Sequence, residues 1–154
     1  MKGNEKVLEA LNEALSEELT AINQYILHSE MCANWGYEKL HDVIEHRAID
    51  EMKHAEKLIA RVLFLEGMPI VSKLNPLHVG DAVAVQLQND IEAEYGAVKA
   101  YNEGVHLAVE VGDNTTRALL ESILHDEEEH IDWLEAQRDQ IQQVGLANYL
   151  AQQI

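Results

Sequence analysis

The sequence is poor in cysteine, proline, phenylalanine and basic residues, and each shortage excludes a class of protein. Its 154 residues include one cysteine, Cys32, two prolines and one phenylalanine, with 11 basic side chains against 28 acidic ones. A single cysteine excludes an internal disulfide and a four-cysteine metal site. The formal net charge of -17 argues against nucleic acid as a partner, because binding to phosphates requires basic patches.

The sequence also lacks a long apolar run. Its first residues, Met1 to Lys6, are mostly polar and charged, unlike a signal peptide or a transmembrane helix. We therefore expect a cytoplasmic protein with no membrane partner. Hydrophobic residues make up 47% of the chain, enough for the core of a single domain over residues 1–154. The acidic surface either keeps the protein in solution or gathers cations, and charge alone does not choose between the two.

Helical periodicity runs through most of the chain and stops where both prolines lie, between Gly67 and Gly80. We predict an all-α fold with four long helices and a short fifth, at about 4–34, 38–65, 82–110, 115–143 and 146–154. The short joints between the first two and the last two long helices predict two helical hairpins, at about 4–65 and 82–143. The 67–81 connection is long enough to cross over the length of a helix, which would make the second and third helices parallel. The pattern predicts a four-helix bundle with a long crossover.

Each predicted long helix carries one glutamate near the middle of its apolar stripe, where a bundle helix normally has leucine. These glutamates are Glu18, Glu51, Glu94 and Glu127. The first two and the last two are each 33 positions apart, and an offset of 76 maps the first hairpin onto the second. The same offset maps His54 on His130 and Tyr25 on Tyr101. The chain is therefore predicted to be two related hairpins, with all four carboxylates at one level.

Four carboxylates in an apolar interior require compensating positive charge. No lysine or arginine lies on the stripes beside them, whereas two divalent cations would balance the charge. Histidines three positions after Glu51 and Glu127 would bind the same ions as neutral ligands. We therefore predict a two-metal site formed by Glu18, Glu51, His54, Glu94, Glu127 and His130.

Oxygen and nitrogen ligands fit iron, manganese or zinc rather than a thiolate metal. The symmetric carboxylate site with a tyrosine beside it favours two iron ions, oxidised by oxygen or peroxide with one electron from each. Tyr25 lies two helical turns from Glu18 on the same stripe. It either supports the site, through a hydrogen bond or an electron, or is a core tyrosine with a satisfied hydroxyl.

Short motifs spread over the whole chain add a second kind of evidence. They are Asn23-Gln24-Tyr25, Ile49 to Ala55, Leu63 to Gly67, Asp126-Glu127-Glu128, His130 to Glu135, Gly145-Leu146 and Asn148-Tyr149-Leu150. In these motifs the chain resembles the bacterioferritins, the haem-binding branch of the ferritin-like di-iron carboxylate family. That family has the ligand pattern found above, with one Glu from each of two helices and Glu-x-x-His from each of two others.

The resemblance implies iron storage and detoxification by a homo-oligomeric, hollow 24-subunit shell. Ferroxidase activity at the six ligands would convert Fe(II) to Fe(III) with oxygen or hydrogen peroxide, and the shell would hold the ferric mineral. Glu51 and Glu127 would bridge the two metals, and the C-terminal helix would line a channel. His46 and Asp50 match an inner-surface iron site. A ferredoxin-type reductant is the implied partner for iron release.

The resemblance also implies haem, with a b-type or related porphyrin, shared by two subunits. Met52 matches the axial ligand, supplied once by each subunit. The chain departs from the family around this position. It has Ile26 and Glu45 where aromatic residues are common, and Arg47 where an acidic residue is common.

Two other functions remain open from the sequence. One is a stand-alone di-iron enzyme that removes peroxide, because ferritin-type sites use peroxide as an oxidant. The other is a metal-free structural or docking bundle, which would leave the four glutamates without a role.

Overall fold

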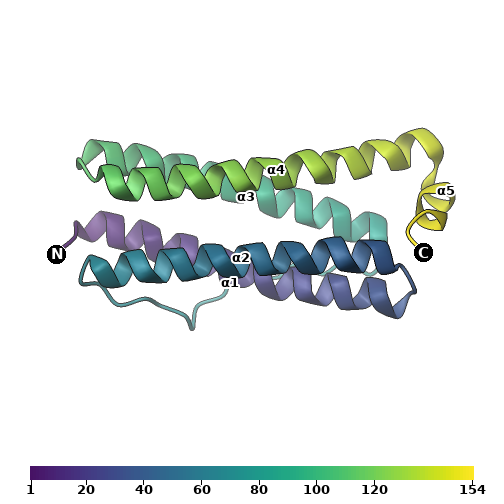
Figure 1. Ribbon diagram of the computed structural model, residues 1–154, viewed down its shortest axis with the longest axis horizontal. Helices are drawn as coiled ribbons and strands as arrows, with labels where there is room; N and C mark the ends of the chain where they lie inside the picture. Colours follow the sequence, from purple (N-terminus) through teal and green to yellow (C-terminus); the bar gives the residue numbers. More distant parts are fainter.

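The computed structural model, which describes residues 1–154, is a bundle of four long helices with a short fifth at one end (Figure 1). The helices are α1 (Glu5–Asn34), α2 (Glu38–Phe64), α3 (Val83–Glu110), α4 (Asn114–Val144) and α5 (Leu146–Ala151). The predicted all-α, ferritin-like class is confirmed. Helix α5 ends at Ala151, before the expected 154. The carbonyls of Gln152 and Gln153 instead accept hydrogen bonds from Lys39 at the start of α2.

The two hairpins form two layers, with α1 packed mainly on α2 and α3 mainly on α4. Figure 1 shows that α2 and α3 run in the same direction, and that the crossover passes along the α1–α2 hairpin to connect them. Gly36 and Gly112 stand in the two hairpin joints with φ of 83° and 76°, a left-handed conformation that glycine adopts without strain. None of the helices combines the length and the apolarity needed to span a membrane.

One polar face of α1 holds the crossover in place. Thr20 Oγ1 accepts from the Asn75 N–H at 2.8 Å, and Gln24 Oε1 accepts from the His78 N–H at 3.1 Å. One further turn along α1, His28 Nε2 accepts from the Gly80 N–H at 2.9 Å. The crossover has no helix or strand of its own, so these side chains supply partners that its main chain would otherwise lack. The connection is thereby fixed over the middle of the bundle.

The apolar core is divided into two clusters by a polar layer. One cluster contains Val7, Leu11, Leu15, Ala55, Leu58, Val62, Leu65, Tyr101, Leu120 and Ile123. The other contains Tyr25, Cys32, Leu40, Ile44, Ala48, Val83, Leu87, Ile91, Leu134 and Tyr149. Along α1 the order is Leu15, Glu18 and Tyr25, so the glutamate lies between a residue of each cluster. The same interruption on all four long helices creates the polar layer.

Candidate metal centre

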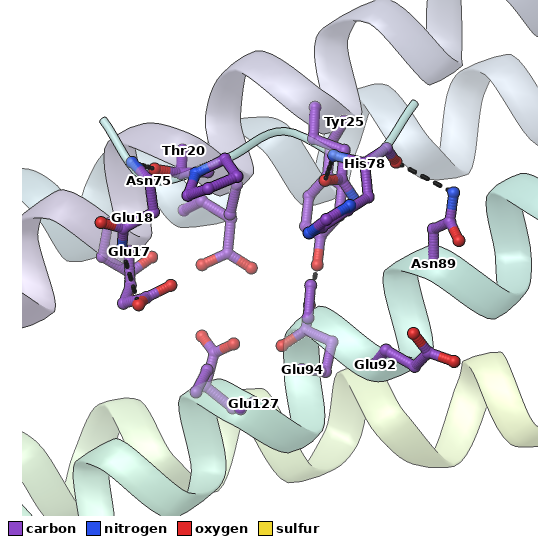
Figure 2. Close-up of a pocket in the computed structure, with 17 residues that line it drawn as sticks. Glu17, Glu18, Thr20, Tyr25, Asn75, His78, Asn89, Glu92, Glu94 and Glu127 are labelled. Atoms are coloured by element: carbon purple, nitrogen blue, oxygen red, sulfur yellow. Dashed lines mark hydrogen bonds between the residues drawn. The ribbon is translucent and has the colours of Figure 1, made fainter. Parts of the chain in front are cut away.

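All six predicted ligands lie in the polar layer at the middle of the bundle. Helix α1 contributes Glu18 and α3 contributes Glu94, while α2 and α4 each contribute a Glu-x-x-His pair. The side chains are almost fully buried, with exposed fractions from 1% for Glu51 to 6% for His130. Figure 2 shows Glu18, Glu94 and Glu127 pointing toward one common space. The sequence spacing therefore identified residues that the fold brings together.

The ligands form two overlapping groups, and within each group one donor atom from every residue lies within 4.8 Å of the others. The first group consists of Glu18, Glu51, His54 and Glu127. The second consists of Glu51, Glu94, Glu127 and His130. Glu51 and Glu127 belong to both groups, as expected of ligands that bridge two ions. Each group also has one terminal glutamate and one histidine of its own.

Both histidines turn Nδ1 toward the carboxylates. His54 Nδ1 lies 2.9 Å from Glu127 Oε1 and 3.1 Å from Glu51 Oε2. His130 Nδ1 lies 3.1 Å from Glu51 Oε1 and 3.4 Å from Glu94 Oε1. The centroids of the two imidazole rings are 6.3 Å apart. Nδ1 is therefore the nitrogen that each histidine presents to a metal.

Two aspartates lie behind the histidines, and sequence reasoning missed one of them. His54 Nε2 lies 2.9 Å from Asp126 Oδ2, while His130 Nε2 lies 3.7 Å from Asp50 Oδ2. An Nε2–H that donates to a carboxylate fixes the tautomer in which Nδ1 is free to bind a metal. Asp126 stands 76 positions after Asp50, so the internal repeat contained the signal for it. Asp50 contacts the centre from behind, in addition to lying near His46.

Two tyrosines contact the terminal glutamates from the opposite hairpin. The Tyr25 hydroxyl donates to Glu94 Oε1 at 2.6 Å, and the Tyr101 hydroxyl donates to Glu18 Oε1. Burial, followed by the neighbouring glutamate, raises the pKa of each phenol well above its ordinary value. Both tyrosines therefore stay protonated and act as donors. The role of Tyr101 was missed, although the repeat paired it with Tyr25.

The metal-free centre holds protons on four of its ligands. Burial, together with nearby glutamates, raises the pKa of Glu18 well above its usual range and that of Glu127 to about 12. Burial opposes the charged form of both histidines, but hydrogen bonds with the glutamates outweigh it. They raise the pKa of His54 strongly and that of His130 to about 9.

The pKa of Glu51 shifts in the opposite direction from the pKa values of Glu18 and Glu127. Burial acts to raise its pKa as well. Hydrogen bonds with Glu18, His130 and His54 outweigh that effect and hold the pKa well below its ordinary value. Glu51 is therefore ionised, whereas Glu18 and Glu127 are protonated. The metal-free layer reduces its own charge by distributing protons among its ligands.

The unpaired atoms of the protein provide a test of whether these residues fit metal ions. Five buried side-chain nitrogen and oxygen atoms make no well-formed hydrogen bond, namely Glu18 Oε2, Glu51 Oε1, Glu94 Oε2, Glu127 Oε1 and His130 Nδ1. Three of them lie close only to other predicted ligands, at 2.9 Å for Glu127 Oε1 to His54 Nδ1 and 3.1 Å for Glu51 Oε1 to His130 Nδ1. All five belong to the predicted ligands. A buried polar atom without a partner costs about 1–3 kcal/mol, so such atoms are rare unless something else binds them. Carboxylate and imidazole donors converging on two positions fit two cations.

Comparison with known proteins agrees with this geometry. Residues 8–144 match the family model of the ferritin-like domain. The chain is 45% identical to the bacterioferritin of Rhodobacter capsulatus over 137 residues, which is 89% of this chain and 85% of that protein. The chain belongs to the bacterioferritin family. The bacterioferritins of Brucella melitensis and Mycobacterium leprae are 42% and 43% identical to it, covering 97% and 99% of this chain and 92% and 96% of their own. Iron storage is the function of this family.

In this bacterioferritin-family chain the centre is reached from two sides. A pocket of about 320 Å³ lies between α1, α3 and the crossover, with Glu18, Glu94 and Glu127 among its lining residues. Figure 2 shows Asn75 and His78 of the crossover beside this pocket. A smaller pocket of about 150 Å³ lies behind the histidines and is lined only by polar and charged residues of α2 and α4. Ions and small oxidants therefore have short paths to the ligands.

Of the residues matched to other bacterioferritin sites, Met52 and His46 lie outside the centre, and Asp50 lies behind His130. Met52 is 46% exposed on α2, and Ile26 on α1 is exposed as well. His46 Nε2 lies 3.9 Å from Asp50 Oδ2. Arg47 stacks over the Trp133 ring at 5.2 Å from its centroid and donates to the His130 carbonyl at 3.0 Å. Arg47 stands where the family commonly has an acidic residue, and it thus places a fixed cation against the helix that carries His130.

Proposed function

We propose that the chain binds Fe(II) as a substrate at the six-ligand centre, oxidises it to Fe(III), and delivers the product for storage inside a homo-oligomeric 24-subunit shell. The observation that carries this proposal is the set of five buried atoms without a well-formed hydrogen bond, all on predicted ligands that form two overlapping donor groups. A metal-free structural bundle would have no use for such atoms, and each of them would destabilise it.

The charge balance of the centre fits ferrous iron. Two Fe(II) ions carry four positive charges, which four ionised glutamates would neutralise while both histidines bind in the neutral form. Oxidation then takes one electron from each ion. With hydrogen peroxide the reaction is 2 Fe(II) + H2O2 + 2 H⁺ → 2 Fe(III) + 2 H2O. With oxygen, the same two electrons and two protons give hydrogen peroxide.

The chain's own residues prepare this oxidation. Glu51 and Glu127 hold the two ions close together, so that one oxidant can take both electrons. Asp126 orients His54, and burial excludes bulk water from the ligands. The pocket beside the crossover is a route for Fe(II) and oxidant to enter. His46 and Asp50 on the other side would receive iron or electrons, and a ferredoxin-type protein would be the reductant for release.

We propose haem as a second cofactor, held between two subunits. The thioether of Met52 would supply one axial ligand and the same residue of a second copy the other. Its position supports this role, because the side chain is exposed on α2 and does not belong to the di-iron ligands. Ile26, which stands where the family commonly has an aromatic residue, is exposed as well.

Aerobic addition of excess Fe(II), followed by gel filtration with iron and protein quantified, tests the proposal. Hundreds of irons eluting with a very large particle are expected. The double variant Glu18→Gln with Glu94→Gln should lose rapid oxidation, whereas Glu56→Gln with Glu128→Gln, two exposed glutamates, should behave as the wild type. Two irons per subunit on a small species would indicate a stand-alone peroxide-removing enzyme instead. No binding of iron would contradict the metal centre itself.

A further inference from the structure

Tyr101 forms a hydrogen bond that mirrors the one made by Tyr25, across the two hairpins. Tyr101 of α3 donates to Glu18 of α1, whereas Tyr25 of α1 donates to Glu94 of α3. Each terminal glutamate therefore receives a phenol from the helix that carries the other terminal glutamate. The offset of 76 between Tyr25 and Tyr101 equals the offset between the two glutamates.

The two rings are anchored on opposite sides of the polar layer. The ring of Tyr101 belongs to the apolar cluster that contains Leu15 and Leu58, and the ring of Tyr25 to the cluster that contains Leu87. Both side chains are only 2% exposed. A ring packed in an apolar cluster is held in one rotamer, so its hydroxyl has a fixed position. The phenols thus reach the ligands from the two ends of the layer.

The phenols divide the oxygens of each terminal glutamate into two kinds. In Glu18 and in Glu94, Oε1 accepts the phenol hydrogen bond and Oε2 has no partner. A hydroxyl hydrogen occupies one lone pair of Oε1 and makes that oxygen a poorer metal donor. Oε2 retains its full donor strength and is buried in the layer. No tyrosine hydroxyl donates a hydrogen bond to the two glutamates shared by both groups, Glu51 and Glu127.

We infer that Tyr101, as the counterpart of Tyr25, is a positioning residue that restricts Glu18 to a single ligand oxygen. The inference rests on the proposed two-metal centre. One donor atom from each residue of a group gives four protein donors per ion. A glutamate that bound through both oxygens would add a fifth. Tyr101 thereby keeps a coordination position open on the ion bound by Glu18 and His54, where the oxidant or water can bind.

The variant Tyr101→Phe removes the hydroxyl and keeps the ring. Co(II) is the probe because the protein does not oxidise it and because its visible d–d absorption reports its coordination number. Titration of the metal-free chain should show two Co(II) sites in the wild type. In Tyr101→Phe, Glu18 loses its orienting hydrogen bond, and the freed Oε1 can join the coordination of the ion. We therefore expect the visible d–d absorption of one of the two sites to lose intensity.

Two further variants make the result specific. Tyr95→Phe is the matched control, since it removes a phenol–glutamate hydrogen bond, to Glu135, on the exposed surface of the same helix. In a His130→Ala background, where only the other half-site keeps its histidine, the effect of Tyr101→Phe should persist. The effect of Tyr25→Phe should disappear in that background.

The outcomes separate this inference from the proposed function. If the wild type binds two Co(II) and Tyr101→Phe has the same spectrum as Tyr95→Phe, then Tyr101 is only a core residue and the inference is wrong. If the wild type binds no Co(II), the metal centre itself is contradicted. Far-ultraviolet circular dichroism of each variant shows that the helices are intact.

Discussion

Binding of two divalent ions should release about four protons from this protein and should tighten steeply with pH. In the metal-free chain, the pKa values of Glu18 and Glu127 are raised, so both are neutral acids near pH 7. The pKa values of His54 and His130 are raised as well, so both imidazoles are charged. A metal ligand must lose its proton before it binds. Two acids and two imidazoliums therefore give the four protons.

The magnitude follows from linkage between protons and metal. Each proton released per ion changes the binding constant tenfold per pH unit, so two protons per ion predict roughly 100-fold tighter binding from pH 6 to pH 7. The same four groups make the stability of the metal-free fold depend on pH in the opposite direction, because they stabilise it most at low pH. Their folded pKa values exceed the unfolded ones, so their stabilisation is complete only below 4.5 for the acids and 6.5 for the histidines. It is lost as pH rises through the folded values, including the value of about 9 for His130.

Isothermal titration with Co(II) in buffers of different ionisation enthalpy counts the protons directly. Glu127→Gln should release about one proton fewer than the wild type, because the amide has no proton to lose. Glu128→Gln, at the exposed neighbouring position, should release the same number as the wild type. Fewer than about one proton per chain, with affinity constant between pH 6 and pH 8, would refute the reasoning.

Three further changes test other parts of the structure. Asp126→Asn removes the charge that accepts the His54 Nε2–H at 2.9 Å. It should weaken one Co(II) site by about 10–100-fold in a titration, and an unchanged curve would exclude a positioning role. Met52→Leu should abolish the haem absorption of the purified protein without slowing Fe(II) oxidation, and retained haem would rule out this ligand. Tyr149→Phe removes a buried hydrogen bond to Gln137 of 2.9 Å. It should lower the free energy of unfolding in urea by about 1 kcal/mol, and no change would mean that this bond does not anchor α5.

The convergence of the six candidate ligands could be predicted from sequence because helical periodicity and spacing determine both the face and the level of a side chain. A glutamate inside an apolar stripe must point into the bundle, and equal spacing about each hairpin joint brings all four to one height. The long helices accordingly begin and end within one residue of the predicted limits. The crossover could be predicted from its length and its prolines.

Contacts between hairpins could not be predicted in this way. The bonds of Tyr101 to Glu18 and of Asp126 to His54 join residues of different hairpins, and the pattern within one helix does not specify which side chains of the facing hairpin it meets. Only the offset of 76 pointed to Tyr101 and Asp126. The polar face of α1 that holds the crossover was missed for a different reason. Polar residues four positions apart, such as Thr20 and Gln24, normally indicate a face turned to solvent.

The division of the core into two clusters makes the bundle modular. Leu58 and Leu87 are fully buried in different clusters, and each replacement by alanine should cost about 2–5 kcal/mol. In the metal-free chain the two losses should add within about 0.5 kcal/mol, because the polar layer separates them. Metal bound at the proposed centre would join residues from all four helices across that layer. A departure from additivity that appears only with metal would therefore measure the mechanical coupling between the two halves through the centre.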